Sequence, residues 1–195
     1  MEGMVIMGTV TVSKVNKSNF SKSLLFSKRY NHITSRLSKG IARYLAGDFN
    51  NISQTNDFIP RYLGVGKGAN TPISVETSTT YGTNDPEFGL SDLLSPIPNK
   101  DNPTRVPITS KEVDLVEISG SSISSNTKST VTIKAFIPPA LIESKTRIDE
   151  LGLFSDISGS NLVSRLKLIG DDIITVEAGF GIDIVWVLSI YPASN

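Results

Sequence analysis

The residues with the most evident capacity for chemistry are three acids around the stretch ELGLFSDISGSNLVSRLKL, namely Asp149, Glu150 and Asp156. Two carboxylates can act as general acid and general base when a pocket raises the pKa of one of them. Here the apolar residues alternate on both sides of a polar break at 156–160, which is typical of a β-hairpin. Because Asp and Ser favour turns through local hydrogen bonds, we interpret the acids as solvated residues of strand ends and a turn. We assign no catalytic residue to them.

A second candidate is the glycine run GVGKGAN, in which Gly64, Gly66 and Gly68 surround Lys67. Glycine-rich turns bind phosphate groups when a helix begins directly behind them. This run has neither the dinucleotide-binding nor the Walker spacing, and Pro72 follows it in place of a helix. The sequence therefore indicates a tight turn from a strand into a loop, in which glycine adopts a positive φ.

Composition limits metal and covalent chemistry further. The chain contains no Cys, which removes disulfides, thiolate nucleophiles and thiolate-bound zinc. His32 is the single histidine, so one chain cannot supply a two-His metal site. Asp171 and Asp172 lack the alternating acids of a calcium loop. We expect a protein that is not an enzyme and that has no metal and no cofactor.

Length and charge divide the chain into two parts. A length of 195 residues suits one main domain with an appendage. The 19 Lys and Arg balance 19 Asp and Glu, so no overall field draws the chain to nucleic acid or membranes. Residues 1–47 nevertheless contain many basic residues and the single acid Glu2. Because such asymmetry marks a binding segment, we separate an N-terminal strand and basic helix at 1–47 from a β-domain at 48–195.

The N-terminal part is predicted to form a short strand, GTVTVSKV, and then an amphipathic helix over 22–46. Apolar residues recur there at steps of three and four; they are Phe26, Tyr30, Ile33, Leu37, Ile41 and Tyr44 or Leu45. Four basic residues lie off this apolar stripe, and we expect them to bind an acidic protein partner; they are Lys28, Arg29, Arg36 and Arg43. A nucleic-acid backbone is the alternative partner, and an ordinary solvated helix face is the other interpretation.

Residues 69–107 are predicted to form a long Pro-rich loop, because six prolines fall in this segment and it lacks periodicity. Loops of this length are usually arms, lids or contact segments. We expect an arm that wraps a neighbouring protein and becomes ordered on contact.

From residue 109 onward the pattern is that of strands. Six apolar segments are separated by Ser, Gly, Asn and Asp: EVDLVEIS, STVTIKAFIPP, RIDELGLFSD, SNLVSRLKLIG, DIITVEAG and GIDIVWVLSIYP. In the second segment, Val131, Ile133, Ala135 and Ile137 fall on one face of a strand. The last segment has no proline before Pro192 and should be a central strand. The pattern predicts a mainly β fold, an antiparallel β-sandwich or barrel.

The order of these segments resembles the C-terminal half of small tail, neck or collar, and baseplate-associated structural proteins of tailed bacteriophages. IDELGLF, GSNLVSRLKL and IITVEAGFGIDIVWVLSIYP follow that pattern of an E-x-GLF strand, a Gly turn, a strand ending in Arg and a final I-x-W-x-L-x-I strand. RYLGVGKGANTP looks like the glycine-bearing first strand of these proteins, so the resemblance covers residues 59–191. Arg165 fits the basic position of the pattern, whereas Val176 and Glu177 stand where a Lys is common.

The resemblance implies a virion structural protein that assembles as a ring or multimer and is made in the host bacterial cytoplasm. Its partners would be other virion proteins and copies of itself, with no small-molecule substrate. We expect no membrane contact, because no apolar run reaches about 18 residues and MEGMVIMGTV does not read as a secretory signal. The alternative is a host-adhesion or carbohydrate-binding β-sandwich module, with ligand contacts from Tyr62, Tyr81 and Phe88.

Overall fold

The structure is a computed structural model, and it describes residues 4–29, 32–34, 37, 40–41, 58–67, 105–116, 128–142, 144–158 and 161–192. The described strands are β1 (Met4–Asn16), β2 (Lys22–Arg29), β3 (His32–Ile33), β4 (Tyr62–Gly66), β5 (Arg105–Val116), β6 (Lys128–Ile137), β7 (Thr146–Ile148), β8 (Glu150–Phe154), β9 (Leu162–Lys167), β10 (Ile174–Val176) and β11 (Phe180–Pro192). Two short 3-10 turns, η2 (Pro139–Leu141) and η3 (Gly170–Asp172), connect some of them. The predicted mainly β fold is confirmed.

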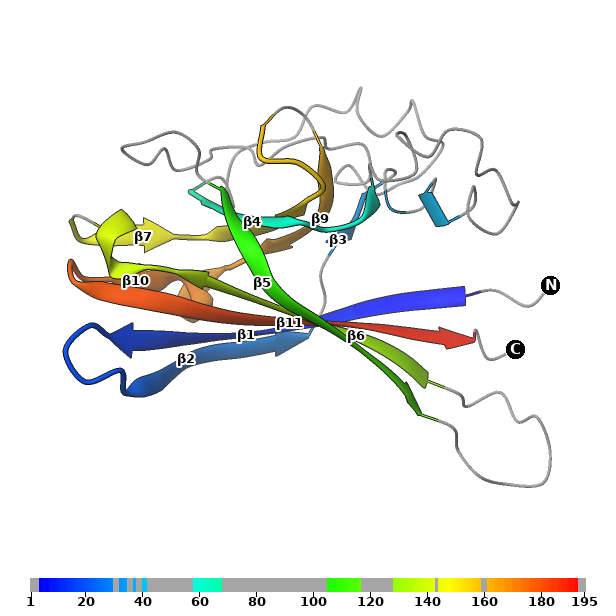
Figure 1. Cartoon of the computed structure of the whole chain (residues 1–195), viewed down its shortest axis with the longest axis horizontal. Coiled ribbons are helices and arrows are strands. Elements are labelled where there is room, and N and C mark those ends of the chain that lie inside the picture. The colour runs from blue at the N-terminus through cyan, green and yellow to red at the C-terminus, as the bar shows by residue number, and fades with distance from the viewer. Residues whose placement is uncertain are drawn as a thin grey trace.

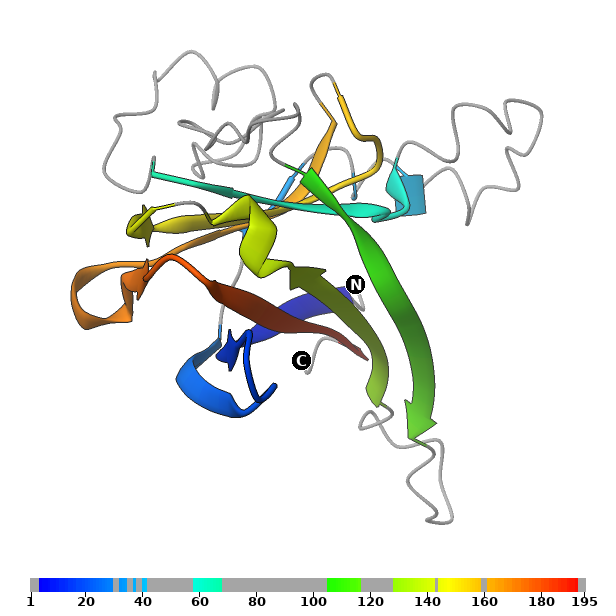
Figure 2. The ribbon, with the colours of Figure 1, turned by 60° about the vertical axis from the view of Figure 1, so that its left-hand side comes forward.

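Nine of these strands form one antiparallel sheet in the order β2-β1-β11-β6-β5-β4-β8-β9-β3, and β7 pairs with β10 separately. The sheet curls over itself, as Figures 1 and 2 show. We call β2, β1, β11, β6 and residues 108–116 of β5 the large half-sheet, and β4, β8, β9 and β3 the small half-sheet. The two halves face each other but belong to one continuous sheet, because β5 pairs with β6 in the large half-sheet and with β4 in the small one.

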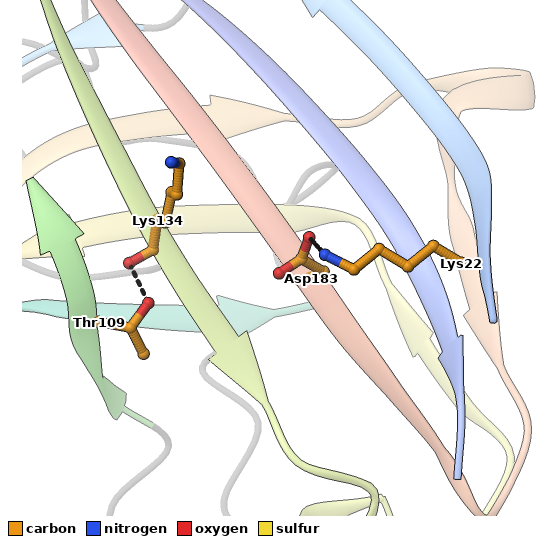
Figure 3. Close-up of polar contacts among 4 residues, drawn as sticks. All are labelled: Lys22, Thr109, Lys134 and Asp183. Carbon is orange, nitrogen blue, oxygen red and sulfur yellow. Dashed lines mark hydrogen bonds and ion pairs between the residues drawn. The ribbon is translucent and has the colours of Figure 1, made fainter. Parts of the chain in front are cut away.

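The curl coincides with an irregularity in β5. The pairing of β5 with β6 shifts register between Ile108 and Ser110, so Thr109 is an extra residue. The Thr109 hydroxyl donates a hydrogen bond of 3.0 Å to the carbonyl oxygen of Lys134 (Figure 3). Because such bulges bend a strand and increase its twist, this one redirects β5 from β6 toward β4.

The hydrophobic core lies between the two half-sheets. Alternate residues of a strand point into this core: in β6, Ile133 and Ala135 are buried, whereas Thr132 and Lys134 are half-buried. The small half-sheet contributes buried residues of β4, β8 and β9, and β1 and β11 contribute others. Trp186 of β11 is fully buried, and β11 itself lies between β1 and β6, so the prediction of a central last strand is confirmed.

The helix predicted over 22–46 is wrong in its first part. Lys22–Arg29 is strand β2, which pairs antiparallel with β1 after a turn in which the amide of Phe20 donates to the carbonyl of Asn16. The register of β1 with β2 shifts between Val12 and Ser13, so Leu25 is an extra residue in β2. This bulge breaks the two-residue alternation of apolar residues that would have indicated a strand. The apolar stripe on which the helix prediction rested has only Phe26 within β2. Within 30–46, the described helical backbone is at 37 and 40–41.

The predicted loop at 69–107 also has a wrong boundary. Arg105, Val106 and Pro107 form the beginning of β5 and pair with Gly64, Leu63 and Tyr62. Proline is tolerated at this position because it stands near the start of the strand, where fewer ladder hydrogen bonds are required. The remainder of the predicted loop, 69–104, lies outside the described residues.

Candidate functional site

The acids of the β8–β9 hairpin divide into an exposed residue and two buried ones. The hairpin itself is confirmed, with Glu150 opposite Lys167 and Leu153 opposite Ser164. Asp156 is exposed, and its Oδ1 accepts a hydrogen bond of 2.6 Å from the amide of Ile157, as expected of a turn residue. Asp149 and Glu150 are buried. The prediction that all three acids are solvated is therefore wrong for these two.

Glu150 forms an ion pair with Arg165. The Nε and Nη2 atoms of Arg165 donate to Oε2 of Glu150 at 3.0 and 2.7 Å, and both side chains are 0% exposed. Arg165 lies opposite Gly152 on β8 and opposite His32 on β3. Two charges withdrawn from water depend on each other, because either one alone would lack a compensating charge. The Glu150 carboxylate thus has a structural partner that links β8 to β9.

A second arginine, Arg105 of β5, binds the turn between β8 and β9. Its Nη1 donates to the carbonyl oxygen of Asp156 at 3.0 Å and to Oδ1 of Asn161 at 2.9 Å. Its guanidinium lies 3.6 Å from the centroid of the Phe154 ring, a cation–π arrangement. Arg105 therefore joins the beginning of β5 to the turn after β8.

Gly64 of the GVGKGAN run has a packing role. Gly64 and Gly66 lie within β4, as expected of a glycine-bearing strand through RYLGVG, so the prediction of a positive-φ turn is wrong at these two positions. Lys67 follows them as an exposed residue, and Gly68 lies outside the described residues. A Cβ atom at Gly64 would lie 2.8 Å from Cε2 of Phe154. Glycine at this position lets the Phe154 ring lie directly over the backbone of β4.

The other predicted positions are distributed over the fold. His32 lies in β3, not in a helix, and Asp171 and Asp172 belong to the turn η3. Lys28 and Arg29 lie on β2, opposite Val10 and Thr9 of β1. The other two predicted partner-binding residues, Arg36 and Arg43, fall outside the described residues, as do Tyr81 and Phe88.

Among the described strands, the large half-sheet has two open edges. Of the strands that the structure describes, only β1 pairs with β2. Similarly, residues 110–116 of β5 pair with β6 on one side, whereas β4, the other described neighbour of β5, pairs only with 105–107. In Figure 2, β2 and β5 run along the two opposite borders of the large half-sheet. An edge strand presents unpaired backbone N–H and C=O groups that can pair with another strand.

The two edges differ in charge. β2 contains Lys22, Lys28 and Arg29 and no acid, whereas the open part of β5 contains Glu112 and Asp114 beside Lys111. Partial burial lowers the pKa of Lys111 below its ordinary value, and the nearby positive charge of Arg61 lowers it further. One edge is therefore basic and the other carries two carboxylates.

Ion pairs on the outer face orient some of these charges. Lys22 Nζ reaches across β1 to Oδ2 of Asp183 on β11 at 2.6 Å (Figure 3). Lys134 Nζ lies 2.7 Å from Oε1 of Glu112, whose side chain remains 62% exposed. The Glu112 carboxylate thus has free access to solvent on its remaining sides and can accept a further donor.

Each edge also exposes a large apolar side chain. Leu24 on β2 is 65% exposed and Val113 on β5 is 68% exposed. Neither strand is protected by a proline in its open part. Open backbone, opposite charge and exposed apolar residues together make these two edges the candidate functional site, which the sequence pattern indicated only through Lys28 and Arg29.

Other kinds of site are not evident in the part of the chain that the structure describes. Its residues include no group of three or more His, Cys, Asp or Glu arranged to hold a metal ion. Within the described ranges, no helix has the length and apolar character to cross a membrane. Comparison with known proteins found no family model, curated protein or solved structure that matches this chain.

Proposed function

We propose that this chain is a non-enzymatic structural protein of a tailed bacteriophage, which assembles as a ring or multimer in the neck, tail or baseplate. The observation that carries the proposal is the pair of open edges, β2 and residues 109–116 of β5, on opposite borders of one half-sheet. Open strand edges invite pairing with another chain, and a monomeric protein usually protects them. The order of the motifs from 148 to 191, which resembles that of phage structural proteins, supports a place in the virion.

The proposed partners are other copies of this chain and neighbouring virion proteins. Lys28 and Arg29 would contact an acidic surface from a strand edge, where the backbone also takes part in binding. The protein would be made in the host cytoplasm and then incorporated into the particle.

The three acids at the β8–β9 hairpin, Asp149, Glu150 and Asp156, support a structural role over catalysis. Glu150 is bound by Arg165, and Oδ2 of the buried Asp149 lies 3.4 Å from Nη2 of Arg147. Asp156 stabilises its own turn. General acid–base chemistry requires a carboxyl group that faces a substrate, and these three groups are directed to other parts of the protein.

The carbohydrate-binding alternative is less well supported. A sugar-binding site usually offers an aromatic ring whose face is open to the ligand. Tyr62 is half-buried and packs against the cluster of Phe154 and Leu162. This packing places Tyr62 in a small cluster apart from the main core, on the face of β4 opposite to that of Leu63 and Val65, where neighbouring side chains cover part of its ring.

Light scattering coupled to size-exclusion chromatography tests the proposal. The wild-type protein should have a native mass that is a multiple of the 21.1 kDa chain. A monomer throughout the accessible concentration range would contradict self-assembly, and a monomer that binds glycans would favour the adhesion alternative.

A further inference from the structure

We propose that copies of this chain join head to tail through their sheet edges, with β5 of one copy pairing with β2 of the next. This inference rests on the proposed self-assembly and specifies its interface. The large half-sheets would then form one continuous sheet through the assembly. A contact between two different surfaces of the same chain is heterologous, and it closes into a ring when the rotation between copies permits.

The two edges match in length and direction. β2 has eight residues, and the open part of β5, 109–116, is equally long. Each of the five strands of the large half-sheet is antiparallel to its neighbours, so β2 and β5 run in the same direction. A ring whose axis runs along the strands would therefore place β5 parallel to β2 of the next copy.

Residues that lie directly opposite one another on successive strands form a row across the large half-sheet, and one such row has opposite charges at its two ends. The row crosses the large half-sheet through residues that lie directly opposite one another: Arg29, Thr9, Val187, Thr132 and Glu112. If the row continues into the next copy, Glu112 lies beside Arg29. Opposite charges at directly paired positions stabilise a sheet. The charge pattern thus favours this junction.

The same charges disfavour symmetric junctions. Pairing β2 with β2 would bring together the basic residues of two copies, because this strand has Lys22, Lys28 and Arg29 and no acid. Pairing β5 with β5 would bring Glu112 and Asp114 close to their own counterparts. Since like charges across a junction are destabilising, the head-to-tail arrangement is the one that complements both edges.

Cysteine cross-linking can test the junction without changing the charged residues. The adjacent row has Ser27 at one end and Ser110 at the other, joined through Thr11, Val185 and Lys134. The wild-type chain has no cysteine, so Ser27→Cys and Ser110→Cys introduce the only thiols. Strands paired in one sheet bring Cα atoms to about 5 Å, within the range of a disulfide.

An equimolar mixture of the two single variants should form covalent dimers on oxidation, whereas each variant alone should remain uncross-linked. The double variant should form a ladder of covalent multimers. A Lys17→Cys variant, altered in the exposed β1–β2 turn, provides the matched control and should not cross-link with Ser110→Cys.

Two results would overturn the inference while leaving self-assembly intact. One is that light scattering shows multimers but the mixture does not cross-link. The other is that Ser27→Cys alone forms covalent dimers, which would show that β2 pairs with β2. A wild-type chain that is monomeric would instead overturn both the junction and the self-assembly on which it rests.

Discussion

Arg165 donates two hydrogen bonds to a single oxygen of Glu150, and neither side chain is exposed to solvent. The pair joins adjacent strands of the hairpin whose motif order prompted the virion interpretation. A register slip of one residue between β8 and β9 would move one of the two charges to the opposite face of the sheet. The ion pair therefore fixes the register of this hairpin.

Replacing Glu150 with Gln should strongly destabilise the protein. The substitution keeps the shape of the side chain but leaves the buried Arg165 guanidinium without a compensating charge, which typically costs about 3–5 kcal/mol. Urea denaturation followed by circular dichroism would measure the change in free energy of unfolding. Glu177→Gln is the matched control, because Glu177 pairs with Lys145 at the surface, where such pairs contribute about 0–1 kcal/mol. Equal effects of the two substitutions would contradict a structural role for the buried pair.

Replacing Gly64 with Ala should lower the free energy of unfolding by about 1–3 kcal/mol, because the added methyl group would overlap the Phe154 ring. The same substitution should cost less in a Phe154→Leu background, where the ring is absent. A double-mutant cycle built from denaturation curves measures this coupling. If Gly64→Ala costs the same in both backgrounds, contact with Phe154 is not the reason for glycine at this position.

Replacing Lys111 with Gln should stabilise the protein slightly at neutral pH; the effect is small because the side chain is exposed and water screens its charge. The pKa of Lys111 is lowered in the folded state from 10.5, first by burial and then by Arg61. Between the lowered pKa and 10.5 the unfolded chain binds more protons, so the Lys111 contribution to stability rises with pH across this window. The advantage of Lys111→Gln should therefore be greatest below the window and disappear above 10.5.

The measurement is the difference in free energy of unfolding between Lys111→Gln and wild type across alkaline pH, at one protein concentration. Lys17→Gln, in the exposed β1–β2 turn, gives the baseline for losing one positive charge. If the stabilisation of Lys111→Gln relative to wild type instead increased with pH, the pKa of Lys111 would not be lowered in the folded state.

Strands whose alternation is regular could be predicted from the sequence. β6 alternates buried Ile133 and Ala135 with half-buried Thr132 and Lys134, and β11 continues the same regularity through Trp186. The bulge at Leu25 explains the failure at β2, because one extra residue placed Leu24 and Leu25 side by side and concealed the alternation. A bulge depends on the partner strand and has no clear signal within the segment itself.

The burial of Glu150 was missed for a different reason. In a hairpin with one solvated face, an acid at the start of a strand is usually exposed, and this reasoning did correctly predict Asp156. Every residue of β8 is buried, however, which means that both faces of this part of the sheet are covered. The indicative signal was a complementary pair: an acid in one strand of the hairpin and Arg165 in the other. The opposite charges of the two edges depend likewise on sheet order, which local patterns do not determine.

The native mass of charge-reversed variants, measured by light scattering, tests the central claim of edge-to-edge assembly most directly. Arg29→Glu and Glu112→Arg should each reduce the wild-type multimer to smaller species, because each places like charges across the junction. The double variant, in which the charges are exchanged, should restore the multimer, with all three variants retaining the wild-type circular dichroism spectrum. Assembly by each single variant as efficient as that of wild type, or a monomeric wild-type protein, would contradict the account.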